Sequence, residues 1–141
     1  MDIESIAIDP GLIEGGQWVG DIPEMGDLRV RVRGLTSPQA VALRNRLLRA
    51  LPKKDRESDG SPTQEAAMRV GGRVLLEAVL LEWDGITSGG KPVPFSKKQA
   101  EIWLTDPRYR NFGDAVAWAA QIVDKGRAEI TEEIAGNSPA P

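Results

Sequence analysis

The stretch of residues 74–81, VLLEAVLL, constrains the fold more than any other part of the chain. Only Glu77 interrupts its run of apolar side chains. A helix that is apolar on most sides is normally buried in a core. Each large apolar side chain that is buried contributes about 1.5–3 kcal/mol to stability. We therefore expect the rest of the chain to pack around a central helix that contains this stretch.

The composition argues against an enzyme. The chain has 141 residues, of which 40% are hydrophobic and 28% charged, values that suit one globular domain with a core of its own. It contains no cysteine, which excludes disulfides and thiolate catalysis, and no histidine, which removes the commonest general base and metal ligand. We therefore predict a protein that is not an enzyme, with no catalytic residues, no cofactor and no metal site.

The chain carries no sign of membrane insertion or export. No apolar run approaches the roughly 20 residues that a membrane-spanning helix needs. The first ten residues, MDIESIAIDP, are acidic, whereas the start of a secretory signal peptide is basic. We therefore expect a protein that stays inside the cell that makes it and has no membrane partner.

Charge is distributed unevenly along the chain. Residues 1–28 hold seven acidic side chains and no basic one, whereas residues 29–56 hold nine basic side chains and one acid, Asp55. Such a reversal is typical of a nucleic-acid patch, of a charged interface, or of an arm that neutralises its own domain. We divide the chain into an acidic irregular arm (1–16), a single helical domain with an N-terminal hairpin (17–135) and a disordered tail (136–141).

One strand has a clear signature near the N-terminus. Apolar and basic residues alternate from Leu28 to Arg33, which is the period of a strand with one face exposed to water. With residues 17–20 and the Pro- and Gly-containing connection at 22–26, this strand predicts a β-hairpin. A hairpin alone is marginal in water, so it must pack on helices.

Four helices are predicted after the hairpin, at residues 37–51, 62–83, 96–105 and 111–134. Ser37, Ser61 and Ser96 have the residue type and spacing of N-caps, and Asn111 is the predicted cap of the last helix. The glycines at 71 and 72 weaken the second helix unless another helix packs closely there. The expected fold is a mainly α, small domain of about four helices with a short N-terminal β-hairpin.

Residues 85–91, GITSGGK, match the first part of a phosphate-binding loop. The match fails at Pro92, where such a loop needs a serine or threonine to hold Mg²⁺. The stretch also follows a predicted helix where a phosphate loop follows a strand, and no helix begins at Lys91. We interpret it as a structural turn.

Tryptophan and arginine residues are the candidates for partner binding. Trp83, Trp103 and Trp118 adjoin apolar helical faces and are predicted to pack in the core. The acids Glu77, Glu82 and Asp84 are interpreted as a solvated helix face, with Glu77 spaced to pair with Arg73. Arginine is favoured at protein interfaces, while the absence of interleaved aromatic residues does not favour direct nucleic-acid binding. The candidate partner-binding residues are Trp18, Arg29, Arg31, Arg33, Arg44, Arg46 and Arg49.

Several short motifs between about Leu28 and Val123 resemble those of a known family. They are Val32-Arg33-Gly34-Leu35-Thr36 before a helix, Trp83-Asp84-Gly85, Pro92-Val93-Pro94-Phe95-Ser96, Leu104-Thr105-Asp106-Pro107, and Ala115 with Ala119. Together they resemble the tail assembly chaperones of long-tailed, siphovirus-type bacteriophages. The acidic first 28 residues lie outside the resemblance.

The resemblance implies a non-enzymatic protein of the bacterial host cytoplasm that binds the tape measure protein and helps recruit tail tube subunits. It would leave before the virion is complete and would form a homo-oligomer. Two alternatives stay open at this point. One is a structural tail or connector protein that is retained in the virion with large obligate interfaces. The other is a small nucleic-acid-binding regulator that uses the arginines.

Overall fold

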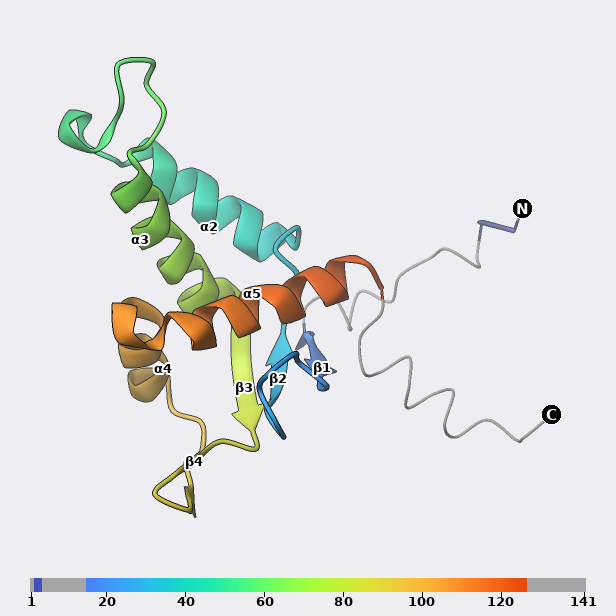
Figure 1. The fold of residues 1–141 in the computed structure, drawn as a ribbon. Helices are drawn as coiled ribbons and strands as arrows, with labels where there is room; N and C mark the ends of the chain where they lie inside the picture. The colour runs from blue at the N-terminus through green and yellow to red at the C-terminus, as the bar shows by residue number, and fades with distance from the viewer. Residues whose placement is uncertain (1, 4–14, 127–141) are drawn as a thin grey trace.

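The computed structural model describes residues 2–3 and 15–126. Most of the predicted acidic arm, residues 127–134 of the last predicted helix, and the predicted tail lie outside these described residues. Figure 1 shows a three-stranded sheet that helix α5 crosses, with helices α2 and α3 side by side at one end of the sheet. The prediction of a small, mainly helical domain with an N-terminal strand pair is confirmed.

The elements follow one another with short connections. In chain order they are β1 (Gln17–Val19), β2 (Arg29–Val32), α2 (Pro38–Arg49), the 3-10 turn η2 (Lys53–Asp55), α3 (Gln64–Val74), the π-helical turn η3 (Leu75–Val79), β3 (Leu80–Asp84), the two-residue strands β4 (Thr87–Ser88) and β5 (Lys91–Pro92), α4 (Lys97–Thr105), the 3-10 turn η4 (Pro107–Tyr109) and α5 (Arg110–Asp124).

The predicted hairpin forms, but it gains a third strand. Antiparallel β1 and β2 pair with Val19 opposite Val30, and β3 pairs antiparallel with the other edge of β2, with Trp83 opposite Val30. The prediction that the second helix continues to residue 83 is therefore wrong, since Leu80–Asp84 is a strand. A short apolar run fits a buried helix or a buried strand equally well, and pairing with β2 decides for the strand here.

A π-helical turn joins the second long helix to the sheet without a loop. The N–H of Leu80 donates to the carbonyl of Leu75, and at Leu80 the backbone turns extended, with φ −76° and ψ 121°. Leu76, Ala78 and Val79 are buried here, so the stretch expected to anchor the core does so. Exposed Glu77 pairs with Arg73 at 3.3 Å, as its spacing predicts.

Helix α5 lies across one face of the sheet (Figure 1) and closes the core. The small side chains of Ala115, Ala119 and Ala120, all buried, let α5 approach closely, and Val116 is fully buried among them. From the sheet and from η3, Val30, Val32 and Val79 are also fully buried. The alternation along β2 thus places its valines in the core and its arginines on the opposite face, as predicted.

Helices α2 and α3 pack on each other, and Arg56 holds the connection between them. Its guanidinium donates to the carbonyl oxygens of Leu48 and Leu51, which satisfies the open carbonyl end of α2. The predicted cap Ser37 is confirmed. The predicted cap at Ser61 is wrong, because Thr63 caps α3 by accepting from the N–H of Ala66 at 3.1 Å.

Helix α4 begins at the predicted cap, since the hydroxyl oxygen of Ser96 accepts from the N–H of Gln99 at 3.1 Å. It passes so close to α3 that a Cβ on Gly72 would lie 3.0 Å from the carbonyl oxygen of Leu104. Close packing at this glycine is therefore confirmed. The predicted cap Asn111 is wrong, because α5 continues directly from η4 and has no side-chain cap at Tyr109.

The last residue of α5 fastens the start of α2. The carboxylate of Asp124 accepts from the N–H of Leu35 at 3.1 Å, from the N–H of Thr36 at 3.2 Å and from the hydroxyl of Thr36 at 2.6 Å. Gly34 makes this contact possible, since a Cβ at that position would overlap the Asp124 carboxylate. A residue without a side chain is therefore needed at the glycine of the Arg33-Gly34-Leu35-Thr36 motif, so that Asp124 can pack there.

We expect Asp124→Ala to lower the free energy of unfolding by about 1–3 kcal/mol, because two backbone N–H groups and a hydroxyl lose a charged acceptor. Faster hydrogen exchange at the Leu35 and Thr36 amides, with α4 unaffected, would locate the effect at this contact. Gln121→Ala, an exposed change on the same helix, is the control and should leave both measurements unaltered.

Candidate partner-binding surfaces

The sheet face opposite α5 brings together three of the candidate partner-binding residues. Trp18 and Arg31 are opposite each other in the β1–β2 register, and Arg29 lies on the same face two residues along β2. The Arg29 guanidinium lies over the Trp18 ring, 5.1 Å from its centroid. The Arg29 side chain is 42% exposed, so this face of the sheet is accessible to a partner.

The β2 arginines of this face contact acids on β3. Arg29 lies 3.9 Å from the Asp84 carboxylate, and Arg31 lies 3.5 Å from that of Glu82. The interpretation of Glu82 and Asp84 as a solvated helix face is therefore wrong, because both lie on a strand beside arginines. Exposed pairs of this kind contribute at most about 1 kcal/mol each, so a partner can replace them at little cost.

Arg33 has a structural role instead. Its guanidinium donates to the carbonyl of Ala78 at 3.2 Å, and its backbone N–H donates to the carbonyl of Val79 at 2.9 Å. Both acceptors belong to η3, where the helix changes into a strand and its last carbonyls need donors. Arg33 thus fastens β2 to the end of the π-helical turn.

The arginines of α2 form a second, separate surface. Arg46 and Arg49 lie exposed in the last turn of α2, three residues apart and so on one side of the helix, while Arg44 is half-buried. Their positive charge complements the negative end of the helix. Within residues 2–3 and 15–126, no carboxylate lies at ion-pair distance from any of the three.

The two groups of arginines do not merge into one positive face. Helix α2 runs away from the sheet (Figure 1), and at 1.5 Å per residue its last turn lies roughly 15 Å from its start. The sheet arginines are also neutralised by the β3 acids. The chain therefore offers a mixed-charge sheet face and a positive helix end.

The predicted core tryptophans differ in their environments. Trp83 is 4% exposed, and its ring packs on those of Phe95 at 4.9 Å and Trp103 at 5.1 Å between centroids. Its indole N–H donates to the carbonyl of Val93 at 2.8 Å. Trp118 is half-buried on α5, so it is more exposed than Trp83, and it lines a pocket between α5 and the β1–β2 connection.

The phosphate-loop-like stretch is a hairpin, as the interpretation as a structural turn requires. Strands β4 and β5 pair with Ser88 opposite Lys91, and Gly89 and Gly90 make the turn with φ of +58° and +80°. A pocket of about 520 Å³ opens at its base, where residues 83–87 meet residues 92–94. The backbone groups here close the hairpin, since the N–H of Val93 donates to the carbonyl of Ile86.

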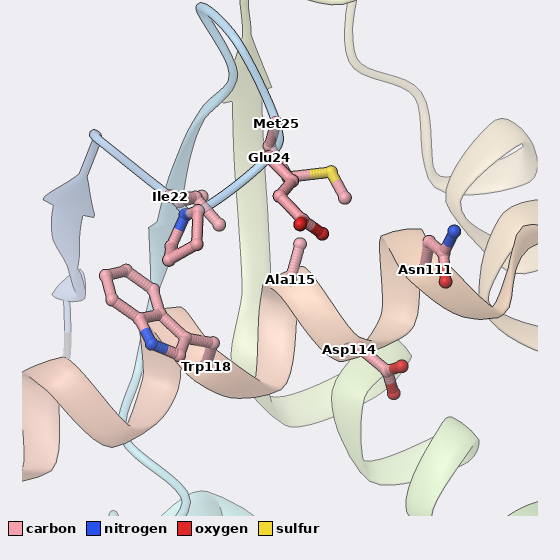
Figure 2. Close-up of a pocket in the computed structure, with 8 residues that line it drawn as sticks. Ile22, Glu24, Met25, Asn111, Asp114, Ala115 and Trp118 are labelled. Atoms are coloured by element: carbon pink, nitrogen blue, oxygen red, sulfur yellow. The ribbon is translucent and has the colours of Figure 1, made fainter.

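A smaller pocket of about 210 Å³ lies between the β1–β2 connection and α5. Figure 2 shows Glu24 and Met25 reaching from that connection toward α5, where Trp118 and Asn111 lie at opposite ends of the pocket. Buried Ile22 and Leu28 anchor the connection on either side. Glu24 has a positive φ of 65°, which is uncommon for a residue other than glycine.

Charged side chains at the pocket are mostly acidic. Glu24 has no basic group within ion-pair distance among the described residues, and Asp114 on α5 lies 3.9 Å from Arg110. The lining residues also include Pro23 and Ala115, so the pocket combines apolar side chains with two acids. This combination accommodates a side chain that is long and apolar with a cationic end.

Neither a metal-ligand cluster nor a membrane-spanning helix is found in the part of the chain that the structure describes. Residues 2–3 and 15–126 contain no group of three or more acidic side chains that could hold a metal ion. Among the same residues no helix has both the length and the hydropathy to cross a membrane.

The η4 turn is capped by Asp106, whose carboxylate accepts from the N–H of Arg108. Hydrogen bonds from the Arg108 side chain lower the pKa of this carboxyl.

The chain matches the model of a known protein family. The model of the YdaY prophage protein family matches residues 35–137, which is most of the chain. The chain belongs to this family. It is therefore a protein of bacteriophage origin. The matched region starts at Leu35, whose N–H donates to Asp124, and it includes α2, α3, β3, α4 and α5. No curated protein and no solved structure matches this prophage protein.

Three features of these surfaces are not predicted by the sequence. Glu24 and Trp118 come together only because α5 folds back across the sheet, and Asp124 meets Thr36 for the same reason. The acids Glu82 and Asp84 lie in a stretch of helical composition, and only the pairing of this stretch with β2 shows that they belong to a strand. One signal was present in the sequence, since the acids of Leu80–Asp84 match the arginines of β2 in number and spacing.

Proposed function

We propose that this prophage protein is a non-enzymatic tail assembly chaperone that binds the tape measure protein and helps recruit tail tube subunits. It would act in the cytoplasm of the bacterial host. Membership of a prophage family supports the phage context. The lack of cysteine and histidine favours binding over chemistry.

The observation that carries the proposal is the convergence of two of the resemblance motifs, and of the residue before a third, in space. Trp83 begins one motif and contacts Phe95, which belongs to the next. Trp103 also contacts Trp83 and directly precedes the Leu104-Thr105-Asp106-Pro107 motif. Two of the motifs, and the residue before a third, thus meet in one aromatic cluster. Their common place in the core supports the proposal that the motifs belong to one structural unit, as the resemblance to the tail assembly chaperones implies.

The accessible surfaces suit a chaperone, which must hold its client and later release it. The sheet face offers Trp18 with exposed arginine–acid pairs, each worth at most about 1 kcal/mol. The last turn of α2 offers Arg46 and Arg49, which have no carboxylate within ion-pair distance among the described residues. Binding to an extended client through many such weak contacts gives affinity that is lost once tube subunits compete for the client.

The decisive experiment deletes the gene from the parent prophage, induces it and examines the lysate by electron microscopy. We expect filled heads without tails, and a plasmid copy of the wild-type gene should restore tailed particles. Normal tailed virions from the deletion strain would refute an assembly role.

Two further measurements separate the alternatives. When the tagged chain is co-expressed with the tape measure protein and purified through its tag, the tape measure protein should be retained with it. Stoichiometric amounts of the protein in purified virions would instead favour a structural tail or connector protein. Tight, salt-dependent retention on DNA would favour a regulator.

A further inference from the structure

Two charged regions of the described chain are complementary and cannot meet within one molecule. Glu24 lies at the pocket of Figure 2, while Arg46 and Arg49 lie in the last turn of α2. Helix α2 runs away from the sheet and from the β1–β2 connection (Figure 1). We propose that the pocket receives an arginine side chain from the α2 helix of a second copy, so that copies associate head to tail.

The pocket has the size and chemistry of a receptor for one side chain. Its volume of about 210 Å³ is below the roughly 300–1,000 Å³ of small-molecule sites, which suits one long side chain better than a cofactor. The Trp118 indole gives a face on which a guanidinium stacks. The Glu24 carboxylate provides the counter-charge.

Arginine is the cation that fits these features, because its planar group stacks on an aromatic ring while it donates to a carboxylate. The exposed side of α2 supplies two such residues beside the short side chain of Ala42, which lets another surface approach. On the receiving side, Asp21 and Asp27 extend the negative charge along the β1–β2 connection. No basic residue occurs before Arg29, so this connection carries no opposing charge of its own.

The geometry of association follows from the use of two different surfaces. A head-to-tail contact leaves a free pocket on one end and a free α2 on the other, so assembly proceeds beyond a dimer to a ring or an open chain. Because the contact depends on charge at the surface, association weakens as salt screens it. This inference does not depend on the proposed function.

The test is a charge-reversal pair in the full chain, followed by sedimentation at low and high salt. Glu24→Lys removes the receptor, and the double variant Arg46→Glu/Arg49→Glu removes the inserted group. Each variant alone should self-associate roughly tenfold more weakly than the wild type or worse. Mixed together, they should associate again, because the unchanged pocket of the Arg46→Glu/Arg49→Glu variant receives the unchanged α2 arginines of the Glu24→Lys variant, and the reversed pocket and reversed helix are complementary as well.

Control reversals use exposed charges elsewhere, Glu65→Lys on α3 and Lys98→Glu on α4, and should leave association unchanged. Circular dichroism checks that each variant is folded. If Glu24→Lys does not fold, Glu24→Gln with Trp118→Phe replaces it and should also weaken association. A monomeric wild type, reversals without effect, or variants that fail to associate when mixed would each overturn the inference.

Discussion

Replacing Trp83 by alanine should lower the free energy of unfolding by about 3–5 kcal/mol, the range found for removal of large buried aromatic side chains. Trp83 is 4% exposed, and its ring contacts Phe95, Trp103 and Phe112, which come from three different segments. The change would leave a cavity and leave the Val93 carbonyl without its indole donor. Urea denaturation followed by circular dichroism measures the loss.

The control for this change is Met68→Ala, at an apolar residue that is 61% exposed on α3. It should alter stability by no more than about 0.5 kcal/mol. Trp83→Phe should fall between the two, because it keeps most of the ring contacts and loses the hydrogen bond to Val93. Equal stability of Trp83→Ala and the wild type would show that the motifs do not form a common core.

Gly85→Ala should be strongly destabilising, and Gly90 provides a matched comparison. Both glycines have a φ of +80°, so alanine at either position costs about 1–2 kcal/mol in backbone strain. At Gly90 nothing lies within 4 Å of the new Cβ, whereas at Gly85 the Cβ would overlap the carbonyl oxygen of Asp27. Overpacking adds about 1–3 kcal/mol, so we expect a loss of about 2–5 kcal/mol at Gly85.

The difference between the two alanine variants isolates the contact with Asp27, since the φ term is common to both. The displaced backbone adjoins buried Leu28, so the strain would reach the core and the β1–β2 connection. Urea midpoints of the two variants, measured side by side, give the difference. Equal losses would mean that the Asp27 carbonyl moves aside freely.

Local features of the sequence predict much of this fold. The alternation along β2 and the caps at Ser37 and Ser96 depend on neighbours within a few residues, and all three are confirmed. The spacing of Arg73 and Glu77 is likewise local. Such features need no knowledge of the distant chain, which is why they can be predicted from one sequence.

Features that depend on distant residues were not predicted. The strand Leu80–Asp84 has a helical composition, and its extended state comes from pairing with β2, some 50 residues earlier in the chain. The hydrogen bond between Asp124 and Thr36 and the pocket that Glu24 forms with α5 likewise join segments far apart in the sequence. Of the candidate residues, Trp18, Arg29 and Arg31 share one face, but whether any of the seven contacts a partner stays a prediction.

The hairpin of β4 and β5 gives a practical route for following the protein during an infection. All four strand residues are exposed, and nothing approaches within 4 Å of a Cβ built at Gly89 or Gly90. An insertion at such a tip adds little loop-closure entropy and disturbs no packed side chain. A short epitope or fluorophore-binding tag placed between the two glycines would report when the protein is made after the prophage is induced and where in the cell it lies.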